Sequence, residues 1–330
     1  MSLTMEALSR HRTLILCAAA FGASVAVGWF LCASKKKSKK RKLQKVGEVS
    51  QLFIHPIKSM RGVSLSEAEC EEFGLKNGNL KDRHWLVVTE SKVHVSARQE
   101  PRMVLISVSC NKDHLVLNAP EMEDLKIPLI LPKTNSVSIC KVWGNEVPGR
   151  DCGEDASHWI TNFLKAKQVY RLMHFENKMK PRNPKNEYPT YTENDQVAYP
   201  DLSPLLLLSE ASLDDLNTKL QKKVTIRHFR PNIVITGCSA FEEDSWKEMQ
   251  IGNHVTLKQV MPCPRCILTT VDPDTGVIDM KEPLETLRSY RLCDTADKEV
   301  YKDSPLFGHF LRIEKNGKIK VGDPVYQITY

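Results

Sequence analysis

The chain has 330 residues, 41% of them hydrophobic, which is enough for roughly two domains with buried cores. Its net charge of +7 is unevenly distributed, because residues 1–45 carry ten basic side chains and one acidic side chain. The rest of the chain is therefore slightly acidic, and this balance argues against a nucleic-acid-binding protein.

Residues 13–34 form an uncharged, alanine-rich run, and a dense lysine block follows it from Lys35 to Lys42. At about 1.5 Å per residue, a helix of this length spans about 33 Å and crosses the hydrocarbon core of a bilayer. The excess of positive charge after the run places the C-terminal part of the chain in the cytosol. We therefore predict that residues 1–45 are a basic linker and a signal anchor of the kind found in the mitochondrial outer membrane.

Short strands dominate residues 46–178, which we predict to be one domain. Runs rich in β-branched or aromatic residues, bounded by Asn, Asp, Gly or Pro, indicate strands at 46–57, 84–89, 103–109, 114–117 and 137–143. One helix is expected at 155–165, because Trp159, Ile160, Phe163 and Leu164 share one helical face. Strands at this spacing are typical of a barrel or a sandwich.

Residues 175–200 are polar and contain several prolines, so we interpret them as a domain boundary or a long surface loop. A second domain is predicted for 179–330. Its expected elements are strands at 232–235, 255–260 and 267–271, and helices at 209–220 and 283–290. Ser209 is the expected N-cap of the first helix, with a capping box from Ser212 to Asp215. Asn316-Gly317 predicts a hairpin turn.

The motif that most restricts the chemistry is Cys263-Pro264-Arg265-Cys266. A C-x-x-C pair is typical of half a zinc site, of a dithiol redox pair or of two packed thiols. No second C-x-x-C is present, and no pair of histidines with zinc-ligand spacing follows. The adjacent Arg265 guanidinium favours the thiolate form of Cys266, which is the form that binds metals. The residues alone leave these alternatives open.

Four further segments place polar side chains where predicted strands begin or end. They are Lys58-Ser59, Asp82-Arg83, Asp201-Leu202-Ser203 and Arg230-Pro231-Asn232. Cations at such positions hold anions, and an arginine can donate two hydrogen bonds to a phosphate, but each segment is equally typical of an ordinary turn or salt bridge. The sequence lacks G-x-G-x-x-G, Walker and G-x-S-x-G patterns, which argues against a nucleotide-binding protein and a hydrolase.

Six segments, in order, resemble the mitochondrial amidoxime-reducing components, a family of molybdenum enzymes in the MOSC superfamily. The segments are 57–59, 78–83, 97–102, 230–233, 243–246 and 265–272. The resemblance extends from about residue 46 to residue 328. It implies a β-rich α+β fold, in which a MOSC N-terminal β-barrel-like domain precedes a MOSC β-barrel domain and a single transmembrane helix precedes both.

The resemblance also implies a molybdenum cofactor, Mo-molybdopterin, with Cys266 as the metal ligand and catalytic residue. The residues that match cofactor-binding positions are Lys58, Ser59, Arg83, Asp201, Leu202, Ser203, Arg230, Asn232, Pro264, Arg265 and Phe310. Three positions depart from the family pattern. Pro264 replaces a small polar residue, Phe310 stands where a tyrosine occurs, and Ser239 replaces an acidic residue near the metal.

The implied reaction is the two-electron reduction of N-hydroxylated compounds, such as amidoximes, hydroxamic acids and N-hydroxyguanidines, to the N–H compound and water. Nitrite is considered as a further substrate. Electrons would come from NADH through cytochrome b5 reductase and cytochrome b5. The implied location is the mitochondrial outer membrane, with one membrane span and the catalytic part in the cytosol; a peroxisomal pool is left open.

Two other hypotheses remain beside this one. The chain would be a metal-free MOSC-type binding or sulfur-transfer module, in which Cys266 carries a persulfide. Alternatively, it would be a structural zinc protein that uses Cys263, Cys266 and two distant cysteines such as Cys238 and Cys293.

Overall fold

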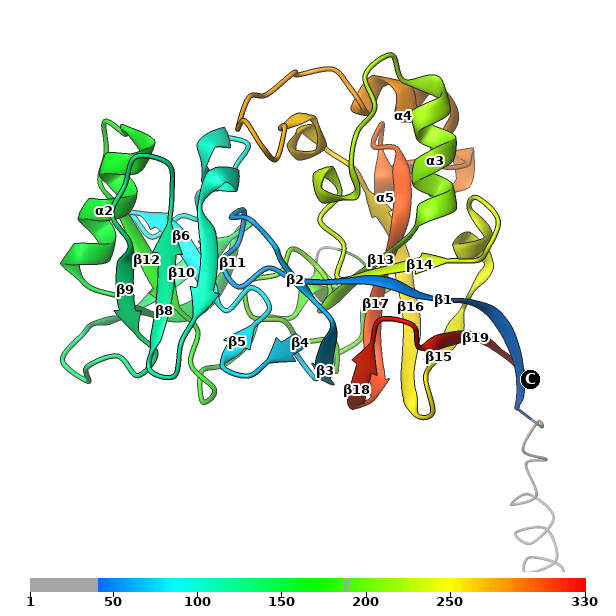
Figure 1. Ribbon diagram of the computed structural model, residues 1–330, viewed down its shortest axis with the longest axis horizontal. Helices are drawn as coiled ribbons and strands as arrows, with labels where there is room; N and C mark the ends of the chain where they lie inside the picture. The colour runs from blue at the N-terminus through cyan, green and yellow to red at the C-terminus, as the bar shows by residue number, and fades with distance from the viewer. Residues whose placement is uncertain (1–40, 187, 189) are drawn as a thin grey trace, which may run out of the picture. The chain divides into compact units, whose positions relative to one another are not determined.

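A closed barrel is the largest sheet of the computed structural model, which describes residues 41–330 except 187 and 189 (Figure 1). Its strands, in order around the barrel, are β1 (Lys42–Ile54), β14 (Ile233–Thr236), β13 (Leu205–Ser209), β17 (Leu306–Lys315), β16 (Val255–Pro264), β15 (Glu248–Ile251) and β19 (Pro324–Thr329). Antiparallel pairing of β1 with β14 closes the sheet. The predicted β-barrel is therefore confirmed.

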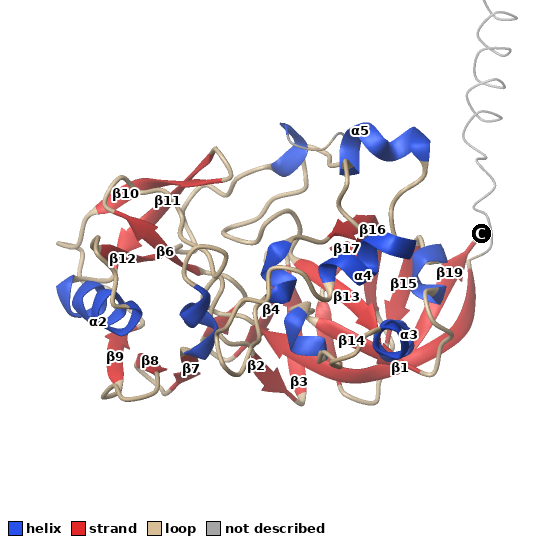
Figure 2. Ribbon diagram, turned by 90° about the horizontal axis from the view of Figure 1, so that it is seen from above, coloured by secondary structure: helices blue, strands red, loops and turns tan. Residues whose placement is uncertain are grey.

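Side-chain alternation separates the inside of the barrel from its outer face. Leu207 of β13 and Ile233 of β14 pack in the barrel core, whereas Leu208 and Val234 pack in a second cluster outside it. The helices α3 (Glu210–Lys219) and α4 (Leu284–Tyr290) contribute to this outer cluster, and α3 lies against β13 and β14 (Figure 2). Burying each such leucine contributes about 1.5–3 kcal/mol to stability.

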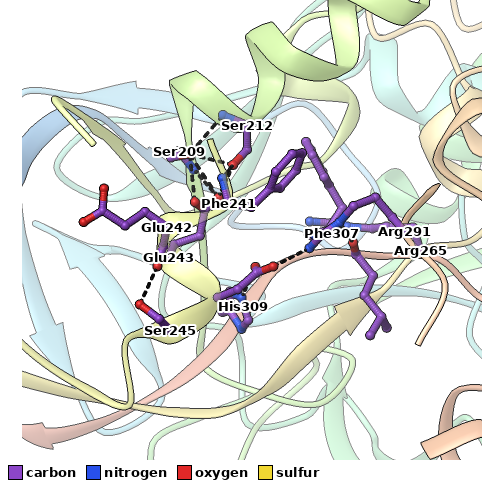
Figure 3. A network of polar contacts seen from close by, with 12 residues as sticks. Ser209, Ser212, Phe241, Glu242, Glu243, Ser245, Arg265, Arg291, Phe307 and His309 are labelled. Carbon is purple, nitrogen blue, oxygen red and sulfur yellow. Dashed lines mark hydrogen bonds and ion pairs between the residues drawn. The ribbon is translucent and has the colours of Figure 1, made fainter. Parts of the chain in front are cut away.

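The start of α3 is fixed by a buried carboxylate. Ser209 is the N-cap, because its hydroxyl accepts a hydrogen bond from the Ser212 amide, as predicted. The predicted capping box from Ser212 to Asp215 is wrong, since the Ser212 hydroxyl donates instead to Glu243 at 2.7 Å. Glu243 also accepts from the Ser209 hydroxyl, so one buried carboxylate satisfies both serines (Figure 3).

Three smaller sheets are built mainly from residues before 178. The first contains β10 (Val137–Val142), β11 (Asn145–Asp151), β12 (Tyr170–His174) and β6 (Trp85–Thr89). The second contains β18 (Gly317–Lys320), β3 (Glu67–Glu71), β4 (Gly74–Asn77) and β5 (Leu80–Lys81). The third contains β7 (Ser107–Cys110), β8 (His114–Asn118) and β9 (Leu125–Pro128). Val93 bridges to Lys141 of β10, and His94 bridges to Val88 of β6, so the first sheet closes into the expected barrel-like form. The helix α2 (Glu154–Leu164) buries its predicted apolar face.

Residues 43–329 form one compact unit. Strand β2 (Val63–Leu65) extends the large sheet beside β1, and the late strand β18 pairs with the early strand β3. Early and late segments thus share sheets, and the proposed division between residues 178 and 179 stays a prediction. The described residues contain no helix that is long and apolar enough to cross a membrane, and the predicted anchor at 13–34 lies outside them.

Two predicted strands are wrong in part or in full. Residues Pro101–Leu105 form a 3₁₀ helix that begins with a proline, and β7 starts only at Ser107. Residues Ile267–Thr270 also form a 3₁₀ helix, in which the Thr269 and Thr270 hydroxyls donate to carbonyls three residues earlier. These local hydrogen bonds outweigh the strand preference of β-branched residues.

The predicted hairpin at Asn316-Gly317 is also wrong. Strand β17 ends at Lys315 and pairs with β13 and β16, whereas β18 pairs with β3 in another sheet. The turn therefore passes the chain from one sheet to another. Gly317 is needed for close approach, because an added Cβ would lie 2.9 Å from a methyl carbon of Val255.

Candidate active site

A cavity of about 400 Å³ contains every residue that the sequence analysis selected for the site. The selected residues that line it are Lys58, Ser59, Arg83, Asp201, Leu202, Ser203, Arg230, Asn232, Pro264, Arg265, Cys266 and Phe310. They come from segments up to about 250 positions apart, between the end of β1 and the strand β17. The structure thus brings the predicted residues together, while their roles in binding a cofactor stay predictions.

Unusual backbone conformations position three of these residues. Ser59, Arg83 and Arg230 have φ angles of 69°, 48° and 55°, in the left-handed region that residues other than glycine adopt rarely. Such a conformation costs on the order of 1–3 kcal/mol and persists only where surrounding contacts impose it. For Arg83, the amide donates to the His55 carbonyl at 2.7 Å. Several strained backbone conformations around one cavity are typical of a functional site.

Asp82 and Asn232 form a buried brace beneath the arginines. The Asn232 side chain donates to Asp82 Oδ1 at 2.9 Å and to the Phe53 carbonyl at 3.2 Å. Its Oδ1 accepts from the Leu206 amide at 3.1 Å and from Arg83 Nη1 at 3.2 Å. Every hydrogen-bonding group of this amide is therefore used within the protein, and its side chain orients Arg83 rather than offering a free donor to a ligand.

Arg83, Arg230 and Arg265 make up an arginine cluster around the segment 229–232. Arg83 Nη2 donates to the Arg230 carbonyl at 3.3 Å, and Arg265 donates to the carbonyls of Phe229 and Phe307 at 2.9 and 2.7 Å. Burial and the neighbouring Arg83 charge lower the pKa of Arg230 to about 9. Nη2 of Arg230 and Nη2 of Arg265 are buried without a hydrogen-bond partner. These N–H groups point to an anionic ligand.

Lys58 adds a further cation, which Asp201 partly neutralises. Lys58 Nζ donates to Asp201 Oδ1 at 2.5 Å and to the Tyr199 carbonyl at 2.8 Å. Burial lowers the pKa of Lys58 to about 8, although the Asp201 charge opposes this shift. Burial by itself would raise the pKa of Asp201, but the Lys58 ammonium, the hydrogen bond from Trp143 and the Arg98 charge together outweigh it, and the net shift is downward. Asp201 is the only carboxylate among the lining residues that the structure describes, and the lysines and arginines among them outnumber it, so this part of the cavity is strongly cationic.

Cys266 lies just after β16 and precedes the 3₁₀ helix Ile267–Thr270, not at the start of a strand as predicted. Its side chain is half-buried and lines the cavity. Cys263 also lines the cavity, but its side chain is buried, and burial raises the pKa of its thiol to about 11. In the described part of the chain, no three His, Cys, Asp or Glu side chains are grouped as a metal site. The four cysteines of the zinc hypothesis are thus not assembled.

Comparisons with known proteins agree with this geometry. Residues 46–167 match the MOSC N-terminal beta barrel domain, and residues 194–326 match the MOSC domain. Mitochondrial amidoxime-reducing component 1 of Homo sapiens is 57% identical over 288 residues, which cover 87% of this chain and 85% of that protein. Mitochondrial amidoxime reducing component 2 of Bos taurus is 55% identical over 294 residues, covering 89% of this chain and 87% of that protein.

The chain belongs to the family of mitochondrial amidoxime-reducing components. The family resemblance found in the six sequence segments is therefore confirmed. Among the three departures from the family pattern, Pro264 and Phe310 line the cavity. Ser239 is not among the lining residues, and its amide donates to Glu242 in the turn before the 3₁₀ helix Glu242–Ser245.

Several residues that line the cavity were not selected from the sequence. They include Ser96, Arg98, Trp143, Tyr188, Thr269, Tyr301 and Lys302. One of them had a detectable signal, because Trp143-Gly144 separates two strand-like runs as a two-residue hairpin loop does. Thr269 lies in the 3₁₀ helix Ile267–Thr270, and Tyr301 ends the short helix α5 (Lys298–Tyr301). The others lie in loops whose sequences carry no periodic pattern.

Proposed function

We propose that the chain reduces N-hydroxylated compounds, such as amidoximes, with a molybdopterin-bound molybdenum ion held in the cavity. In the overall reaction, an amidoxime takes up two electrons and two protons and gives an amidine and water. NADH would supply the electrons through cytochrome b5 reductase and cytochrome b5. The observation that carries the proposal is the joint placement of Cys266 and the arginine cluster in one cavity of a chain from this family.

The residues of the cavity suit such a cofactor. Its volume of about 400 Å³ lies in the range of cavities that bind cofactor-sized molecules. The unpartnered N–H groups of Arg230 and Arg265 suit a phosphate, and Lys58 and Arg83 add positive charge. The half-buried Cys266 offers a soft thiolate ligand, which molybdenum accepts. When bound, the group supplies the two-electron redox chemistry.

The chain itself would contribute binding, orientation and access. The left-handed Ser59, Arg83 and Arg230 are held in place before any ligand arrives, which limits the entropy lost on binding. Because the cavity opens to solvent, water can supply the protons. The names of the relatives support a mitochondrial location. We extend this to the cytosolic face of the outer membrane, with residues 13–34 as the anchor.

Metal analysis of the full chain, expressed in a host that makes the pterin, tests the proposal. We expect about one molybdenum per chain and reduction of benzamidoxime with NADH, cytochrome b5 and its reductase. A folded, pterin-supplied chain without metal would overturn the proposal in favour of a binding or sulfur-transfer module. Stoichiometric zinc would instead support a zinc protein.

A further inference from the structure

Trp143 occupies a strained turn at the cavity. The strands β10 and β11 pair up to Val142 and Asn145, which leaves Trp143-Gly144 as a two-residue loop. Both residues have positive φ angles, 51° and 84°, as a type I′ turn requires. Asparagine or aspartate normally occupies the first of these positions, because a bulky residue there costs about 1–2 kcal/mol. A tryptophan kept in this conformation beside a cavity indicates a function for its ring.

Three contacts fix the Trp143 ring. Its Nε1 donates to Asp201 Oδ1 at 2.7 Å, and the His94 ring meets it edge-to-face at 4.3 Å between centroids. The Arg98 guanidinium carbon lies over the ring, 4.4 Å from its centroid. Stacking on a fixed indole limits the conformations of Arg98, which also lines the cavity. Trp143 therefore acts as a platform that presents a guanidinium to the cavity.

The positive charge of Arg98 is offset only in part by the protein, through its attraction to the nearby Asp201 carboxylate. Its Nε is buried without a hydrogen-bond partner, and no carboxylate of the described residues forms an ion pair with it. The nearby Asp201 carboxylate already accepts hydrogen bonds from Lys58 and Trp143. Lys58, Asp201 and Arg98 together thus carry one positive charge in excess. A buried guanidinium N–H without a partner is costly unless a ligand provides an acceptor.

Arg98 stands apart from the predicted cofactor residues. The arginine cluster is tied together through the main chain of 229–232, whereas Arg98 comes from the loop before Pro101–Leu105 and contacts Trp143. It belongs to the segment 97–102, which resembles the family but received no role in the proposed function. We propose that Arg98 binds an anionic group of the substrate. N-hydroxylated compounds that carry a carboxylate would then be preferred over neutral ones. This substrate preference rests on the proposed function.

A matched substrate pair tests this specificity on the loaded full-length enzyme. Benzamidoxime and 4-carboxybenzamidoxime differ only in the carboxylate, so the ratio of their kcat/KM values isolates its recognition. We expect the unmodified enzyme to favour the carboxylate. Arg98→Gln should lower the ratio about tenfold or more, as the loss of a hydrogen bond between charged groups would, and Arg98→Lys should restore part of it.

A control variant and a binding measurement complete the test. Arg102 stacks on Phe163 at 4.6 Å and is not among the lining residues, so Arg102→Gln removes a similar stack without changing the ratio. Calorimetry with the product 4-carboxybenzamidine, beside benzamidine, measures recognition without turnover. Its affinity should fall in Arg98→Gln, and this result would stand even if neither amidoxime were reduced.

Three results would overturn the inference. The first is the absence of any preference for the carboxylate in the unmodified enzyme. The second is an equal loss for both substrates in Arg98→Gln, and the third is a loss of bound molybdenum and pterin in that variant. The third would assign Arg98 to the cofactor. Failure to reduce benzamidoxime at all, with the calorimetric difference intact, would count against the proposed function alone.

Discussion

Lys58 and Asp201 form an ion pair of 2.5 Å between two segments that lie 143 positions apart. Lys58 follows β1, and Asp201 precedes β13, so the pair fixes the relative position of two chain segments at the cavity. Asp201 also accepts from Trp143, which connects the hairpin of β10 and β11 to the same carboxylate. Since burial brings the pKa of Lys58 down to about 8, the charge of this junction changes within an accessible pH range.

We expect the cofactor-free chain to bind anions more weakly as the pH rises through 8. Lys58 is charged below this value and neutral above it, whereas Asp201 stays ionised throughout. Sulfate is a suitable probe because its charge is constant in this range. Titration calorimetry from pH 6.5 to 8.5, below the pKa of about 9 of Arg230, should show falling affinity for the unmodified chain and weaker, less pH-dependent binding for Lys58→Met. A constant affinity of the unmodified chain would contradict the prediction.

The lowered pKa of Lys58 also makes the stability of the fold depend on pH. An unfolded chain keeps the Lys58 proton up to about 10.5, while the folded chain releases it near 8. Between these pH values the folded state binds fewer protons, so rising pH favours folding at this residue. The free energy of unfolding, relative to that of Lys58→Met, should therefore increase from pH 8 to pH 10 in urea titrations.

The two cysteines of the C-x-x-C motif should behave differently when each is replaced by alanine. Cys266 lines the cavity, so Cys266→Ala should lose molybdenum and reduce benzamidoxime at least about 100-fold more slowly. Cys263 also lines the cavity, but burial raises the pKa of its thiol to about 11 and disfavours the thiolate that binds metal. Cys263→Ala should therefore keep metal and activity and lose only about 1 kcal/mol of stability. Elemental analysis of both variants decides the matter. Loss of metal from both would favour the zinc protein.

The sequence, together with the family resemblance, was enough to select part of the cavity lining, but not residues such as Arg98 and Trp143, and it did not explain how the segments meet. Strand-end cations such as Lys58 and Arg230 indicated anion binding only weakly, and family resemblance was needed to join them. Nothing in the sequence shows that Ser59, Arg83 and Arg230 adopt left-handed conformations, because residues other than glycine take them only when tertiary contacts require it.

The errors in the predicted fold have two kinds of cause, one local and one that depends on distant segments. The run Ile267–Thr270 is rich in β-branched residues, yet hydroxyl-to-carbonyl hydrogen bonds make it a 3₁₀ helix beside Cys266. Asn316-Gly317 has hairpin composition, but its two flanking strands find partners in different sheets. Strand pairing depends on distant segments, which local propensity does not contain.

Asn232→Ala should destabilise the fold strongly. The substitution removes the side-chain acceptor of the Leu206 amide and one of the hydrogen bonds to the buried Asp82 carboxylate, which keeps those from the His55 amide and Arg83. It also frees Arg83 from one of its supports. We expect a loss of roughly 2–4 kcal/mol in the free energy of unfolding, measured by urea titration. Asn79→Ala is the control, because its side chain makes an exposed hydrogen bond, and it should change stability by less than about 0.5 kcal/mol. Equal losses of stability in the two variants would show that the buried hydrogen bonds of Asn232 do not support the fold.

Asp244 should control the segment 291–306, which contributes Tyr301 and Lys302 to the cavity. Its carboxylate contacts Arg291 Nη2 and His309 Nε2, both at 2.7 Å; Figure 3 shows the last two residues. Arg291 in turn holds the base of the segment, where its carbonyl accepts from the Leu306 amide at 2.7 Å and its Nε donates to the Leu306 carbonyl at 3.0 Å.

Asp244→Asn removes the charge from this junction while preserving the side-chain shape. Because hydrogen bonds to charged groups are worth about 1.5–3 kcal/mol, opening of the segment base should become at least about tenfold more frequent. Amide exchange at Leu306 measures this opening directly, since that amide closes the base. Asp303→Asn, an exposed change inside the same segment, should leave the exchange rate unaltered. If Leu306 exchanged equally slowly in both variants, Arg291 would hold the segment without help from Asp244.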